Sequence, residues 1–77
     1  MNSYVITYCD GMPLLTAYET IQGNTPKDAL KRKYNKDFRR VTGDESRYAD
    51  VILQRGYMRD ERTLITQGNQ TCYRIMD

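Results

Sequence analysis

One stretch of the chain, residues 24–36, has the signals of a helix start, whereas most of the remainder has the composition of strands. Thr25 can cap the helix because its hydroxyl can accept a hydrogen bond from a backbone N–H two or three residues later. Pro26 then falls on the first helical position, where its missing N–H is not needed, and Asp28 faces the positive end of the helix dipole. A chain with one helix and several strands is restricted to folds in which that helix covers one face of one sheet.

The apolar side of this helix is narrow. Leu30 and Tyr34 lie one helical turn apart, so they are expected to contact the sheet. We expect the helix to span about residues 26–36, with residue 40 as an alternative end. Phe38 and Val41 are expected to face inward and close the end of the core.

The strands follow from runs of β-branched and aromatic residues between turn signals. Asp10-Gly11 and Gly68-Asn69 are hairpin signals. Residues 42–46 are expected to form a polar loop, and residues 56–62 a charged connection with Tyr57 and Met58 at its tip. The expected strands are residues 3–9, 14–21, 47–55, 63–66 and 70–76.

The order of these elements is ββαβββ. It predicts an α+β fold: an antiparallel four- to five-stranded sheet with one α-helix packed on one face. The 77 residues are expected to form a single domain, 1–77, because domains usually contain roughly 50–200 residues.

Strand alternation divides the side chains between two faces of the sheet. The face under the helix is expected to hold Tyr4, Ile6, Tyr8, Leu15, Ala17, Ile21, Ala49, Val51, Leu53, Leu64, Tyr73 and Ile75. The opposite face is expected to hold Val5, Thr7, Cys9, Tyr18, Ile52, Ile65, Cys72, Arg74 and Met76. A solvated face of an antiparallel sheet is usually more polar than this second set. That face is therefore either an association surface or a face that is merely apolar enough to tolerate solvent.

The charges are segregated along the chain. The net charge is only +2, but residues 27–40 contain seven basic and two acidic residues, a net charge of +5, and the rest carries −3. If the helix extends far enough, Lys31, Arg32, Lys36 and Arg39 share one outward face. This face is either a solvated helix surface or a binding surface, and binding to nucleic acid would be steeply salt-dependent.

Catalysis is not expected. The chain has no histidine, the commonest general base near neutral pH, and no Gly-rich phosphate loop or nucleophile motif. Cys9 and Cys72 cannot close a structural zinc site, which needs four ligands. We expect no cofactor, no metal and reduced thiols. No membrane span or signal peptide is recognisable, so a cytoplasmic location is expected.

The whole chain resembles a class of small phage and mobile-element proteins. Its β-hairpin, the helix TPKDALKRKY and the tail ending in YRIMD are similar in order and length to some anti-CRISPR inhibitors. These include a type I-F inhibitor with the same ββαβββ order and a helix rich in lysine and arginine. The resemblance implies a non-enzymatic inhibitor that occupies a surface of a nucleoprotein complex, and a host cytoplasmic location if a phage encodes it.

The sequence therefore predicts a small non-enzymatic binding protein that inhibits a host defence complex through protein–protein contact. One alternative is a nucleic-acid-binding module that uses the basic helix, and another is a structural or dimerising domain. We expect a monomer or homodimer without membrane contact. The residues expected to contact a partner are Tyr18, Lys31, Arg32, Lys36, Arg39, Arg40, Tyr57, Ile65 and Arg74.

Overall fold

The computed structural model describes residues 1–10 and 19–76 and has the predicted α+β architecture. Five antiparallel strands form one sheet in the order β2-β1-β4-β5-β3. The strands are β1 (Asn2–Cys9), β2 (Thr20–Gly23), β3 (Phe38–Val41), β4 (Val51–Met58) and β5 (Leu64–Ile75). The helix α1 (Pro26–Tyr34) follows β2, and the short 3-10 helix η1 (Gly43–Tyr48) separates β3 from β4.

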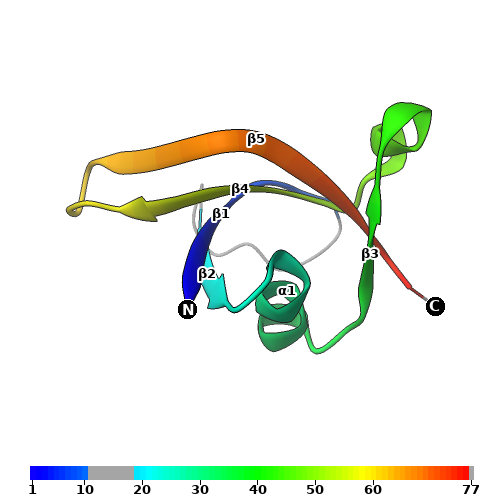
Figure 1. Cartoon of the computed structure of the whole chain (residues 1–77), viewed down its shortest axis with the longest axis horizontal. Coiled ribbons are helices and arrows are strands. Elements are labelled where there is room, and N and C mark those ends of the chain that lie inside the picture. The colour runs from blue at the N-terminus through cyan, green and yellow to red at the C-terminus, as the bar shows by residue number, and fades with distance from the viewer. Residues whose placement is uncertain (11–18, 77) are drawn as a thin grey trace.

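The sheet curls around the helix. Figure 1 shows α1 within the curve, beside β2 and facing β3, with β1 and β4 passing over it. The hairpin formed by β4 and β5 extends beyond the helix on one side, and η1 lies at the other end of the sheet. The ββαβββ order expected from the sequence is thus confirmed, although the strands after the helix are not the expected ones: Phe38–Val41 is an additional strand, and Leu64–Ile75 replaces two expected strands.

Both ends of α1 are fixed by local hydrogen bonds. The Thr25 hydroxyl accepts from the Asp28 N–H at 3.1 Å, and the Asp28 carboxylate accepts from the Asn24 N–H at 3.0 Å. Asn35 adopts the left-handed conformation at φ 56° and donates its N–H to the Lys31 carbonyl, which ends the helix. The helix therefore stops at Tyr34, so the expected ends at residues 36 and 40 are both wrong.

Residues after this cap form an unexpected strand. Phe38 pairs with Ile75 and Val41 pairs with Cys72, so Phe38–Val41 is an edge strand of the sheet. Phe38 joins the core as expected. Val41 is also buried, but its pairing with Cys72 places it on the other face of the sheet.

The two C-terminal strands differ from the expected ones in their bounds. Because residues 43–48 form η1, β4 begins at Val51 rather than at residue 47, and it continues to Met58. Tyr57 and Met58 therefore lie in a strand and not at a loop tip. The expected hairpin at Gly68-Asn69 is wrong, because Gly68 at φ 72° lies within a register shift of the continuous strand β5. The Gly68 carbonyl instead accepts a hydrogen bond from the Gln54 side chain at 2.9 Å.

A bulge in β1 reverses the expected orientation of two side chains. The register against β4 shifts between Ile6 and Tyr8, so one residue of β1 is left without a partner. Tyr8, expected in the core, is 45% exposed. Cys9, expected on the opposite face, packs against the core, with its sulfur 3.4 Å from the Tyr34 hydroxyl.

The core lies between α1 and the concave side of the sheet. Its buried members are Tyr4, Ile6, Ile21, Ala29, Leu30, Phe38, Val51, Leu53 and Tyr73. The expected inward positions Ala49, Val51 and Leu53 are all buried, whereas Leu64 is only half-buried and lies outside this cluster. The expected core residues Leu15 and Ala17 lie outside the described residues.

On the sheet face away from α1, one apolar side chain is covered by neighbouring residues. Val5 is fully buried there, next to Gly56. A Cβ atom at Gly56 would overlap the Ile65 carbonyl oxygen and approach Val5 Cγ2. Glycine thus permits β4 and β5 to lie close together where they leave the main sheet, so Val5 does not contribute to an open apolar surface.

We predict that Leu30→Ala lowers the free energy of unfolding by about 2–5 kcal/mol, the usual range for a fully buried leucine. Chemical denaturation monitored by circular dichroism measures the change. The control is Lys27→Ala on the exposed side of the same helix, expected to change stability by no more than about 0.5 kcal/mol. A parental unfolding curve for Leu30→Ala would contradict the packing of α1.

Cys9 and Cys72 are not joined by a disulfide, and β4 separates the strands that carry them. We therefore predict that alkylation after unfolding without reductant labels both Cys9 and Cys72. Mass spectrometry of the intact chain should show two added groups. An unlabelled species two hydrogens lighter would contradict the strand order, because it requires β1 and β5 to be neighbours.

Candidate binding surfaces

The exposed side of α1 carries less unbalanced positive charge than its sequence indicates. Lys31 Nζ lies 3.4 Å from an Asp37 carboxylate oxygen, and Arg32 Nε lies 3.4 Å from Asp28. Lys33 lies 2.7 Å from Glu19 in a less exposed pair. The chain's own carboxylates therefore neutralise three of the helix cations.

Lys27 and Lys36 differ from these three, since neither has an ion-pair partner among residues 1–10 and 19–76. Both side chains are exposed. Lys36, one of the expected contact residues, lies in the connection between α1 and β3. The free cations of this region are thus separate lysines at either end of the helix.

The expected grouping of helix cations is wrong. Because α1 ends at Tyr34, Arg39 and Arg40 lie on β3, where successive side chains point to opposite faces. Arg40 pairs with Tyr73 on the core side of the sheet, whereas Arg39 pairs with Arg74 on the other side. Lys31, Arg32, Lys36 and Arg39 therefore do not form one outward face.

The structure instead brings Arg39 and Arg74 together around one carboxylate. Arg39 donates from Nη1 to Glu45 Oε1 at 3.1 Å and from Nη2 to Glu45 Oε2. Arg74 donates from Nη1 to the same Oε2 at 3.3 Å. The Arg74 guanidinium also lies 5.9 Å from the centre of the Tyr48 ring. We call Arg39, Glu45, Tyr48 and Arg74 the arginine cluster.

Backbone geometry places Glu45 over the two arginines. Arg39 and Arg74 are directly opposite each other in the β3–β5 register, an arrangement that is unfavourable for like charges. Gly43, at φ 62°, reverses the chain immediately after β3, and Ser46 closes η1 with a hydrogen bond to the Gly43 carbonyl at 2.6 Å. This turn returns Glu45 to the sheet, where its negative charge offsets the repulsion.

The electrostatics of the arginine cluster follow from these contacts. The hydrogen bond from Arg39 lowers the pKa of Glu45 and raises the pKa of Arg39, so both groups remain charged at neutral pH. A hollow of about 340 Å³ lies beside the cluster. Its lining consists of Arg39, Arg74, Ile75 and Met76.

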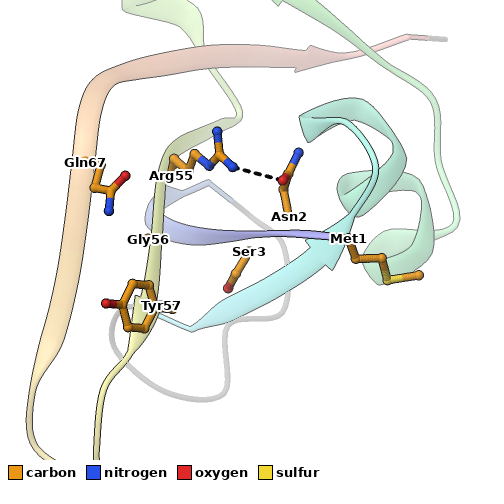
Figure 2. Close-up of a pocket in the computed structure, with 7 residues that line it drawn as sticks. All are labelled: Met1, Asn2, Ser3, Arg55, Gly56, Tyr57 and Gln67. Carbon is orange, nitrogen blue, oxygen red and sulfur yellow. Dashed lines mark hydrogen bonds between the residues drawn. The ribbon is translucent and has the colours of Figure 1, made fainter.

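A second pocket lies where β1 meets the extending β4–β5 hairpin. It has a volume of about 200 Å³, and Figure 2 shows Arg55 reaching across it to Asn2. The Arg55 guanidinium donates to the Asn2 side-chain oxygen at 3.0 Å. The lining residues are Met1, Asn2, Ser3, Arg55, Gly56, Tyr57 and Gln67. Arg55 is the charged side chain of this lining, and its contact with Asn2 holds it across the pocket.

Two expected contact residues lie beside this pocket. Tyr57 lines it and pairs across the hairpin with Ile65, so these two side chains share one face. Tyr57 is 46% exposed and Ile65 is half-buried. Tyr18, the remaining expected contact residue, lies outside the described residues.

A grouping suited to metal binding is not found in the described part of the chain. No three His, Cys, Asp or Glu side chains within residues 1–10 and 19–76 are placed to hold a metal ion. Burial, together with the hydrogen bond to Cys9, raises the pKa of the Tyr34 phenol, so this tyrosine stays protonated at neutral pH.

Comparison of the chain with protein-family models, curated proteins and solved structures finds no match. The described residues contain no helix with the length and apolar character needed to span a bilayer. The case for a function therefore rests on the surfaces themselves.

Sequence reasoning missed two members of the arginine cluster. The sequence predicts a polar loop over residues 42–46, which contains Glu45, and a strand over residues 47–55, which contains Tyr48. Recognising either one requires the pairing of β3 with β5, because only this pairing brings Arg74 to Arg39. The nearest sequence signal is the six-residue spacing from Arg39 to Glu45 across Gly43, which is compatible with a tight reversal.

We predict that the Glu45 carboxyl titrates below its ordinary value of 4.5, and that Arg39→Gln moves its midpoint back toward this value. Because the folded-state pKa is lowered, the stabilisation is present above about pH 4.5 and is lost as pH falls through the folded pKa. Carbon-detected NMR of the side-chain carboxyl measures the midpoint. Arg40→Gln is the matched control and should leave it unchanged; equal effects of the two substitutions would contradict the specific ion pair.

Proposed function

We propose that the chain is a small non-enzymatic binding protein that acts by contact with another protein. The observation that carries the proposal is the combination of exposed tyrosine and methionine side chains with arginines held in defined positions. Tyrosine, methionine and arginine are enriched in protein interfaces. Among residues 1–10 and 19–76, the exposed large hydrophobic side chains are those of Met1, Tyr8, Tyr48, Tyr57, Met58 and Met76.

The ion pairs argue for a protein partner over a phosphate backbone. Nucleic-acid affinity depends on cations that can neutralise phosphates and release counterions. On α1, Lys31, Arg32 and Lys33 are already bound to carboxylates of the same chain. These pairs already neutralise three cations, so the helix offers less uncompensated positive charge to a phosphate backbone than its sequence indicates.

The resemblance of the sequence to anti-CRISPR proteins suggests a class of partner. On this proposal, the chain is of phage or mobile-element origin and inhibits a CRISPR-Cas-type nucleoprotein complex by covering a protein surface of that complex. The absence of a catalytic grouping in the described residues is compatible with inhibition by occupancy. The proposal places the protein in the cytoplasm of the host cell.

The test compares protein and nucleic-acid partners directly. Fluorescently labelled duplex and single-stranded oligonucleotides are titrated with the protein from about 50 to 300 mM salt, the range over which phosphate-driven binding collapses. In parallel, a purified type I-F CRISPR complex is incubated with the protein, and its binding to target DNA is measured. We expect weak, salt-sensitive oligonucleotide binding and a stoichiometric complex with the protein assembly.

Other outcomes overturn part or all of the proposal. Tight oligonucleotide binding that persists at high salt, without any protein partner, would favour the nucleic-acid-binding module. Failure to bind the CRISPR complex, together with nuclease-resistant cross-links to other proteins in cell extract, would reject the proposed defence partner and retain protein binding. A Tyr48→Ser, Tyr57→Ser double variant should weaken the protein complex and leave oligonucleotide binding unchanged.

A further inference from the structure

We propose that Arg39 and Arg74 form a binding site for a carboxylate of the partner protein, and that Glu45 occupies this site in the free protein. The partner residue is an acidic side chain with an apolar neighbour. The inference rests on the proposed protein-binding function, because it names the chemistry that one surface recognises.

The charge balance of the arginine cluster is incomplete. Two guanidinium groups share the single carboxylate of Glu45, which leaves one positive charge unneutralised. The register places the two arginines directly opposite each other, and such like-charge pairs destabilise a sheet. This excess positive charge attracts an acidic group of the partner, whose carboxylate competes with Glu45 for the two arginines.

The space for that group is next to the arginines. The hollow of about 340 Å³ is lined by the two arginines and by Ile75 and Met76. Met76 is 53% exposed, so an apolar surface borders the guanidinium groups. An acidic residue followed by an apolar one matches both parts of this lining, whereas a small inorganic anion would leave the apolar part uncovered.

The Glu45 carboxylate is held weakly enough by the two arginines to be displaced. None of the residues of η1 is buried. The Glu45 side chain is 40% exposed, and the arginines are 44% and 39% exposed. Ion pairs this exposed contribute little free energy, typically about 0–1 kcal/mol. A partner carboxylate can therefore compete with Glu45 without opening the core.

The geometry favours a carboxylate over a phosphate group. Arg39 already binds both oxygens of Glu45 through its two terminal nitrogens, the fork that matches a planar carboxylate. A carboxylate of the partner can therefore replace that of Glu45 on the same fork.

The test uses a six-residue peptide of alternating glutamate and leucine, with a glutamine–leucine peptide as its uncharged counterpart. Binding to the full-length protein is followed by NMR through the Nε–H signals of Arg39 and Arg74. The variants are Arg74→Gln, Glu45→Gln and the matched control Arg40→Gln, which removes an exposed charge on the other face of the same strand. Each variant is first shown to melt cooperatively.

Removal of the internal competitor should strengthen binding. We expect Glu45→Gln to bind the acidic peptide about threefold or more tightly than the parent, and Arg74→Gln to bind it about fivefold more weakly, the scale of one exposed ion pair. Arg40→Gln should stay within about twofold of the parent, and the glutamine–leucine peptide should not shift either arginine signal. An effect confined to folding could not produce the gain in affinity.

Three results would overturn the inference: unchanged affinity in Glu45→Gln, equal weakening in Arg74→Gln and Arg40→Gln, or stronger displacement of the peptide by inorganic phosphate than by acetate. The peptide experiment does not need the natural partner, so its failure leaves the proposed function standing. If the peptide binds as expected but no protein partner is found, the proposed function fails and the site remains.

Discussion

The fold depends on one short helix covering the concave side of a five-stranded sheet. Nine helical residues span only about 14 Å, less than the width of the sheet, so the sheet must curl to bring its outer strands to the helix. Leu30 and Ala29 are fully buried at this contact, and Phe38 on the outermost strand completes the same cluster. The early end of α1 at Asn35 makes this closure possible, because it frees Phe38–Val41 to pair with β5.

Local chemistry in the sequence predicts the helix start, the element order and the inward residues of β4, since each depends on neighbours in the chain. Thr25, Pro26 and Asp28, for example, indicate where the helix begins because they act on backbone groups within one helical turn. The bulge near Thr7 and the continuity of β5 could not be predicted, because they depend on partners distant in sequence. Gly68-Asn69 has the composition of a turn, but pairing with β4 on one side holds the strand through it. The same limit applies to Glu45, whose two partners meet only after β3 and β5 have paired.

The positive surface indicated by the sequence differs from the distribution of positive charge in the folded structure. The run of basic residues at 27–40 indicates one positive face, but the fold distributes it over a helix, a connection and two faces of a strand. Most of the helix cations are paired within the chain, whereas the arginine cluster retains an excess that only the sheet register creates. The proposed binding site therefore lies at the end of the sheet beside η1, and not on the helix, where the sequence suggested it.

The strand order has a consequence for how the chain assembles as it is synthesised. β1 lies between β2 and β4, so the N-terminal hairpin and α1 leave the ribosome with one edge of β1 unpaired. The backbone groups on that edge form hydrogen bonds only after residues 51–58 have emerged as β4. Strand β3 can pair only later, when β5 has been synthesised. Such non-local pairing is slow compared with local contacts, and an open edge can capture another chain. A nascent chain that is arrested before β4 therefore exposes the unpaired edge of β1. The segment that carries β4 and β5 removes this exposed edge by completing the sheet.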